Sequence, residues 1–137
     1  KSIVDGQFSM PFCAAVTVKS GGLQWDDYKN HLNNSDTLSL CNKIKVSPDK
    51  DAEECFPEYM SAKVKVVVKG KKHEKFIKIP KGEPENFMDD AEFISKFQGL
   101  TEPYLSKERV DQLTDIMLKM DQANSVNSIF EYSQIDI

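Results

Sequence analysis

Two histidines, three cysteines and one arginine are the side chains of this sequence best suited to catalysis or metal binding. His31 and His73 lie far apart, and no pair of histidines has the i, i+4 spacing of a zinc-binding helix. There is no Cys-x-x-Cys, no Gly-x-Ser-x-Gly nucleophile motif and no glycine-rich phosphate-binding loop. We therefore predict no metal site, and the sequence shows no catalytic machinery of a recognisable type.

Adjacent carboxylates occur at Glu53-Glu54 and at Asp89-Asp90. Acidic residues are favoured at helix starts because of the positive N-terminal end of the helix dipole, and this explains both pairs better than a catalytic dyad does. A domain that clamped polycarboxylates by itself would be expected to hold several arginines, since the planar guanidinium matches carboxylate geometry. This sequence has a single arginine, Arg109, which argues against such a clamp.

A lysine-rich segment at the centre of the chain concentrates positive charge, whereas residues 82–137 carry 12 acids against four bases. Residues 63–81 hold eight lysines and a single acid, Glu74, in a protein whose net charge is −4. Such a segment could serve a non-catalytic binding module that grips an anionic partner. The plainer interpretation is that these lysines keep a sheet soluble and block edge-to-edge association. The acidic net charge and the shortage of arginine argue against nucleic acid as the partner.

Alternating residues over 62–79 predict a β-hairpin at the centre of the chain. Ala62, Val64, Val66 and Val68 share one face, and a two-residue turn at 69–70 would pair Val68 with Lys71 and Lys65 with Glu74. Residues 43–46 also alternate and read as a further short strand before Pro48. We expect an antiparallel sheet of about three strands.

Helical patterns surround this hairpin. Residues 8–18 read as a short buried helix with Ser9 as N-cap and Pro11 in its first turn, although the β-branched residues 16–18 leave a strand as the alternative. A helix near 26–32 would bury Trp25 and Tyr28. Further helices are expected after the following capping residues: Ser35 or Asp36, Asp89 or Asp90, Ser106, and Ser125. The fold class is therefore α+β, with helices packed on the sheet.

The length of 137 residues fits one domain, 1–137, and its 39% hydrophobic content is ordinary for a globular protein. No apolar run approaches the roughly 20 residues of a membrane span, so no membrane association is expected. Three widely spaced cysteines indicate reduced thiols in a cytosol-like compartment. The chain opens on Lys1 without a signal-peptide pattern, and we expect a fragment of a longer polypeptide.

Several segments, in order, resemble the C-terminal lid domain of the MmgE/PrpD family over about residues 7–121. No single motif decides this resemblance, which depends on the order and spacing of four weak motifs within three stretches. These stretches are GQFSMPFCAAVTVKSGGLQWDDY, then DTLSLCNKIKVSPD, then KVKVVVKGKKHEKFIKIPKGEPENFMDDAEFISKF.

The resemblance implies an enzyme of two domains, a large helical domain that also forms a homodimer and a smaller α+β lid. The family includes 2-methylcitrate dehydratases, cis-aconitate decarboxylases and an iminodisuccinate epimerase. These act on small di- or tricarboxylic acids by abstracting a proton next to a carboxylate, with no metal or organic cofactor. Most acid–base residues belong to the large domain, so this chain alone is expected to be inactive. A cytoplasmic location follows, or a mitochondrial one in a eukaryote.

The resemblance also implies where substrate would lie. In decarboxylase-type relatives a tyrosine of the first helix faces the substrate, and the matching residue here is Phe12, which cannot donate a proton. We expect Ser9, Met10 and Phe12 to line the cleft; the alternative is that Phe12 is a core residue. Lys81, which precedes Gly82 in the loop after the hairpin, is a weaker candidate for the cleft. The preference of turns for residues of these types also accounts for both positions. Besides an enzyme lid and an anion-binding module, a third class of function is a structural interaction domain. Stable self-association of the isolated chain would support this third class.

Overall fold

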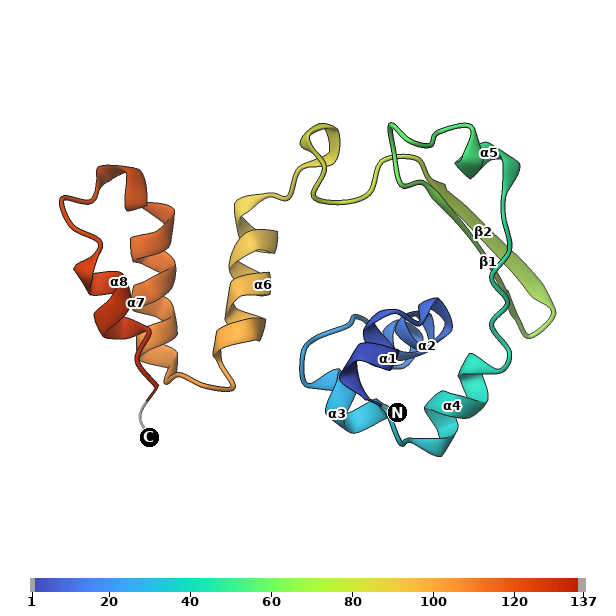
Figure 1. Cartoon of the computed structure of the whole chain (residues 1–137), viewed down its shortest axis with the longest axis horizontal. Helices are drawn as coiled ribbons and strands as arrows, with labels where there is room; N and C mark the ends of the chain where they lie inside the picture. Colours follow the sequence, from blue (N-terminus) through green and yellow to red (C-terminus); the bar gives the residue numbers. More distant parts are fainter. Residues whose placement is uncertain (1, 136–137) are drawn as a thin grey trace. The chain divides into compact units, whose positions relative to one another are not determined.

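The computed structural model describes residues 2–135, which form two compact units. The first unit holds residues up to 23 together with 27–88, and the second holds residues 24–26 and those from 89 onward. Each unit is described by itself below, and Figure 1 gives the order of the elements along the chain. The prediction of one domain over 1–137 stays a prediction.

Four short helices open the first unit. Each of three begins at a side chain that accepts a hydrogen bond from the backbone of the first turn, which supplies a partner for an otherwise unpaired N–H. Ser9 caps α2 and Gly21, at φ 79°, ends it, so the helix prediction for residues 8–18 is confirmed and the strand alternative is excluded. The bounds are α1 (Ile3–Gln7), α2 (Met10–Ser20), α3 (Asp27–His31) and α4 (Ser35–Cys41).

The core of this helical part is small. Phe12, Val16 and Tyr28 are buried together. Partly buried side chains pack against them: Leu23, Leu32 and Cys41. The expectation that Tyr28 is buried is confirmed, whereas the expectation for Trp25 is wrong, because its indole remains nearly half exposed. Trp25 belongs to the second unit and not to this core, and a large amphipathic ring such as indole is seldom fully buried.

The predicted strand at residues 43–46 does not form. The backbone N–H groups of Lys43 and Ile44 donate to the carbonyls of Leu40 and Cys41, at 2.9 and 3.0 Å, so the chain leaves α4 through a tight turn. These donors are then no longer free for a sheet partner. The N-cap of α4 is also one residue earlier than predicted, because Asn34 accepts from the N–H of Thr37 at 3.0 Å.

The hairpin forms in the predicted register. β1 (Ala62–Val68) pairs antiparallel with β2 (Lys71–Ile77), with Val68 opposite Lys71 and Lys65 opposite Glu74. The turn residues Lys69 and Gly70 both have positive φ, 49° and 78°, as a tight hairpin turn matching the strand twist requires. The described sheet has two strands where about three were expected, and the α+β class is confirmed.

Polar segments flank the hairpin on both sides in sequence. α5 (Lys50–Glu53) is capped by Asp49, whose Oδ1 accepts from the N–H groups of Asp51 and Ala52. Ser61 donates to the carbonyl of Lys78 at 2.6 Å and so joins the two ends of the hairpin. Past β2 the chain makes a loop with a 3₁₀ turn, η1 (Pro84–Asn86), before the second unit begins.

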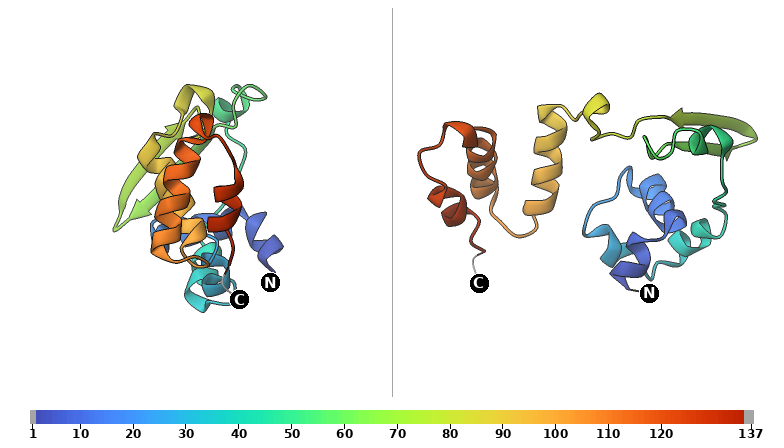
Figure 2. Two further views of the ribbon diagram at one scale, coloured as in Figure 1. Left: turned by 90° about the vertical axis from the view of Figure 1, so that its left-hand side faces the viewer. Right: turned by 45° about the horizontal axis from the view of Figure 1, so that its top comes forward.

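The second unit is helical. Asp89 and Glu92 form a reciprocal capping box at the start of its first helix, and Ser106 caps the next, so both cap predictions are confirmed. Val110 and Leu113 are buried, and Figure 2 shows α8 folded back beside α7. The elements are α6 (Asp90–Thr101), α7 (Lys107–Leu118), η2 (Met120–Gln122) and α8 (Asn127–Tyr132).

Candidate functional site

The first turn of α2 brings together three of the four predicted site residues. Ser9 Oγ accepts a hydrogen bond from the backbone N–H of Phe12 at 3.3 Å, which places the hydroxyl at the start of the helix. Met10 follows and is 70% exposed, whereas Phe12 is only 5% exposed. The turn therefore presents Met10 and the edge of Ser9 to solvent, and directs the aromatic ring of Phe12 inward.

Phe12 is a core residue of the first unit. Its ring stacks on Tyr28, with centroids 6.0 Å apart, and Gly6 lies against both rings. Burial raises the pKa of Tyr28 above its ordinary value, with a smaller contribution from the charge of Cys13. Phe12 thus supports from the core the turn that carries Ser9 and Met10, and its contact with substrate stays a prediction.

Lys81 lies on a separate segment, in the loop that follows β2. Gly82 has φ 103°, a backbone conformation that favours glycine, and its N–H donates to the carbonyl of Asn86 at 2.9 Å. The amide of Asn86 in turn donates to the carbonyl of Ile79 at 2.9 Å. The loop is closed by its own backbone and by Asn86, and it carries Lys81 on its exposed side.

A polar cluster around His31 was not anticipated from the sequence. His31 Nδ1 lies 2.7 Å from Thr37 Oγ1, and the fully buried Thr37 hydroxyl lies 3.1 Å from Asn34 Oδ1. Asn34 Oδ1 can only accept, so the Thr37 hydroxyl donates to it and accepts from Nδ1–H of His31. Nε2 then accepts from Ser20 at 3.2 Å. The available signal was the spacing from Asn34 to Thr37, which is typical of an N-cap.

This arrangement is structural. A nucleophile–base pair would need a carboxylate on the ring nitrogen opposite the hydroxyl. For Ser20, which lies on Nε2, the opposite nitrogen Nδ1 is occupied by Thr37 and not by a carboxylate. For Thr37, Asp27 Oδ1 lies on the opposite nitrogen at 3.9 Å, beyond hydrogen-bond distance, and the fully buried Thr37 hydroxyl donates its proton to Asn34 and has none to give to the ring. The cluster joins the end of α2, α3 and the start of α4.

The lysines of the hairpin form two ion-pair groups with local acids. Lys63 Nζ lies 2.9 Å from Asp49 and also contacts Asp51, and its hydrogen bond lowers the pKa of Asp49 while its own pKa is raised. Glu74 lies 3.1 Å from Lys72 and 4.0 Å from Lys65. The hydrogen bond from Lys72 is the main cause of the lowered pKa of Glu74. The Glu74 pairs are well exposed and contribute little to stability, whereas the Lys63–Asp49 pair is mostly shielded from solvent.

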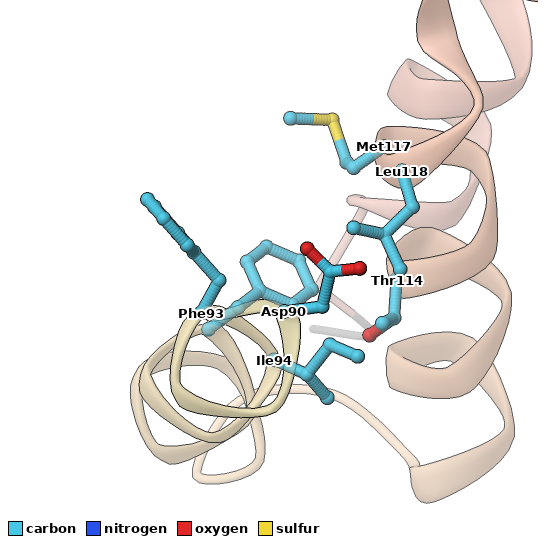
Figure 3. Close-up of a pocket in the computed structure, with 7 residues that line it drawn as sticks. Asp90, Phe93, Ile94, Thr114, Met117 and Leu118 are labelled. Atoms are coloured by element: carbon cyan, nitrogen blue, oxygen red, sulfur yellow. The ribbon is translucent and has the colours of Figure 1, made fainter. Parts of the chain in front are cut away.

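The second unit contains a groove of about 280 Å³ between α6 and α7. Figure 3 shows side chains of both helices turned toward it, with the carboxylate of Asp90 among them. The remaining lining is almost entirely apolar: Phe93, Ile94, Phe97, Thr114, Met117 and Leu118. A single carboxylate among apolar groups offers no acid–base pair within this groove.

Among residues 2–135, no group of three or more histidine, cysteine or acidic side chains is placed to hold a metal ion. Within the same residues, no helix combines the length and the apolar character that crossing a bilayer requires.

The chain matches the model of a known protein family. A family model described as the MmgE/PrpD C-terminal domain matches residues 1–122 of this chain. The chain belongs to the MmgE/PrpD family. The match covers α1 through η2 and confirms the predicted family and the prediction that the chain corresponds to its C-terminal domain. Searches of curated proteins and of solved structures found no match. The MmgE/PrpD family is generally enzymatic, of the dehydratase and lyase type.

Proposed function

We propose that this chain is the substrate-covering part of an MmgE/PrpD lyase or isomerase that acts on small di- or tricarboxylic acids. The family match over residues 1–122 carries the proposal. The reaction is dehydration, decarboxylation or epimerisation, each begun by abstraction of a proton next to a carboxylate. A large helical domain of the same polypeptide supplies the acid–base groups and the homodimer contact, and no cofactor takes part.

The first turn of α2 is the part of this chain that meets the substrate. Ser9 Oγ accepts from Phe12 N–H, and this leaves the hydroxyl proton available to a carboxylate oxygen. The positive N-terminal end of α2, a helix of 11 residues, favours an anion at the same place. Met10 is exposed beside Ser9 and provides the apolar wall.

Closure of this unit over the substrate would exclude water and complete the site. Exclusion of water strengthens the interaction of the helix end and the Ser9 hydroxyl with the substrate carboxylate, because the local dielectric falls. Phe12 acts indirectly, since its buried ring fixes the turn that carries Ser9 and Met10.

The test replaces exposed side chains at the two ends of α2 in the full-length enzyme. Met10→Ala removes the side chain proposed to contact substrate, and Val18→Ala is the matched control, since Val18 is 68% exposed near the other end of the helix. We expect Met10→Ala to raise KM or lower kcat at least about threefold, a loss of roughly 0.7 kcal/mol, and Val18→Ala to change neither. Equal, unchanged kinetics in both variants would remove this turn from the substrate site.

A further inference from the structure

The two faces of the hairpin differ in character. In an antiparallel pair, residues directly opposite each other project from the same face of the sheet. One face therefore combines a row of valines from β1 with a row of basic side chains from β2, and we call it the valine–lysine face. Its members are Val64, Val66, Val68, Lys71, His73 and Lys75.

The opposite face is electrically balanced by local acids. It carries Lys63, which pairs with Asp49 and Asp51, and it carries Lys65 and Lys72 beside Glu74. The cross-strand register places Glu74 directly opposite Lys65 on this face. The chain thus supplies its own counter-charges on one side of the hairpin.

On the valine–lysine face, by contrast, Lys71 and Lys75 have no acidic partner within the first unit. No part of the first unit covers the valines opposite them, and Val66, at the centre of the row, is 41% exposed. A contiguous apolar row with uncompensated charge along one side is typical of a docking surface rather than of a solvent face.

The geometry of the face defines what fits it. The valine row spans about 13 Å from Val64 to Val68, at roughly 3.3 Å per residue, which equals about nine residues of α-helix. Directly beside it, Lys71 and Lys75 lie on the neighbouring strand, about 5 Å away. A partner that satisfies both rows needs an apolar stripe with carboxylates along one edge, over two to three helical turns.

We propose that the valine–lysine face docks an amphipathic α-helix of a partner segment whose apolar stripe is flanked on one side by aspartate or glutamate. A nucleic-acid strand would leave the valine row against a polar backbone, and His73 alone among the residues of this face has a ring on which a base could stack. The proposal goes beyond the enzymatic proposal and does not depend on it.

The test uses the 137-residue chain and a synthetic, fluorescently labelled 18-residue helical peptide. The peptide carries leucines at i, i+3, i+4 and i+7 positions, glutamates along one edge of that stripe and alanines elsewhere. Two control peptides replace the glutamates by glutamine, or the leucines by alanine. We expect the first peptide to bind, with an affinity that falls at higher salt, and each control peptide to bind at least about tenfold more weakly.

Matched variants on the two faces locate the binding surface. Val66→Thr and Lys75→Gln alter the valine–lysine face, and we expect each to weaken peptide binding about three- to tenfold. Val67→Thr and Lys72→Gln make the same changes on the other face, where Val67 is 69% exposed, and should leave binding unchanged. Threonine keeps the β-branched shape, so the hairpin is retained, and circular dichroism confirms this.

Any one of three outcomes would overturn the proposal. The first is that the glutamate peptide binds no more tightly than its glutamine control, and the second is that substitutions on the two faces weaken binding equally. The third is that the chain does not bind the peptide but binds phosphatidylserine-containing vesicles or single-stranded RNA, and that Val66→Thr and Lys75→Gln reduce that binding. Activity of the full-length enzyme is not a readout in any arm, so failure here leaves the enzymatic proposal unaffected.

Discussion

The rings of Phe12 and Tyr28 stack with their centroids 6.0 Å apart and their planes inclined by 21°. This contact joins the first turn of α2 to α3, because Phe12 belongs to the former and Tyr28 to the latter. Both rings are buried, while Met10, two residues before Phe12, is exposed. The aromatic pair therefore supports, from the core side, the turn of α2 that we propose contacts the substrate.

Replacing Phe12 tests this support. Phe12→Ala is expected to lower the free energy of unfolding of the first unit by about 3–5 kcal/mol, since it removes a buried ring and leaves a cavity. Phe8→Ala is the control, because Phe8 is 87% exposed just before the same helix, and its effect should stay within about 0.5 kcal/mol. Urea unfolding followed by circular dichroism measures both. Similar losses in the two variants would contradict the placement of Phe12 in the core.

Gly6 tests the same aromatic contact from α1. A Cβ at this position would lie 3.0 Å from Tyr28 Cδ1 and 3.1 Å from Phe12 Cε1, so Gly6→Ala forces the rings to move. We expect a loss of about 1–3 kcal/mol in unfolding free energy. Gly22→Ala is the matched control, because a Cβ there meets nothing within 4 Å. Thermal unfolding of the two variants should separate them clearly; equal melting temperatures would show that α1 does not pack on this pair.

Local patterns predicted much of this fold. The hairpin register followed from alternation and a Lys-Gly turn, and the caps at Ser9 and Ser106 followed from side chains that accept backbone hydrogen bonds. The strand expected at 43–46 failed, since alternation over four residues does not reveal whether a partner strand exists. The His31–Thr37 contact depends on how α3 and α4 meet, which no local pattern contains.

The candidate site was likewise predicted only in part, because local patterns determine a helix start but not what packs against it. The first turn of α2 was placed correctly from its sequence, and the inward direction of Phe12 was one of two interpretations. The groups opposite Ser9 and Met10 cannot be derived from local patterns in residues 1–137, since our proposal assigns them to another domain of the enzyme.

The Lys63–Asp49 pair predicts a pH dependence of stability. The hydrogen bond from Lys63 lowers the pKa of Asp49 from its ordinary value of 3.8. A lowered folded-state pKa stabilises the fold above the unfolded-state value, and this stabilisation is lost as the pH falls through the folded-state value. The stability difference between the wild type and Lys63→Met should therefore be present at about pH 5 and shrink toward about pH 2.

Chemical unfolding at a series of pH values measures this difference. Lys50→Met is the control, because Lys50 lies 3.7 Å from Glu54 in a strongly exposed pair that should contribute little at any pH. A constant difference between wild type and Lys63→Met across the acid range would show that the ion pair does not depress the pKa of Asp49.

Two substitutions of Ser9 distinguish capping from contact with substrate. Ser9→Ala removes the hydroxyl and the cap, which costs about 1 kcal/mol of stability, whereas Ser9→Asp keeps an accepting oxygen at the N-cap but, when ionised, has no donor. If the hydroxyl donates to a substrate carboxylate, both variants lose at least about tenfold in kcat/KM of the full-length enzyme, equivalent to about 1.4 kcal/mol. Recovery of wild-type kinetics by Ser9→Asp would limit Ser9 to its capping role.

The most direct test of the central claim, that this chain covers a catalytic centre located elsewhere in the polypeptide, is proton exchange next to a carboxylate. NMR in D₂O follows exchange of that proton in small di- and tricarboxylic acids, with the 137-residue chain alone and with the full-length enzyme. We predict no exchange above background with the chain alone and exchange or turnover with the full-length enzyme. Sustained exchange by the chain alone, abolished by a substitution within residues 2–135, would contradict the account.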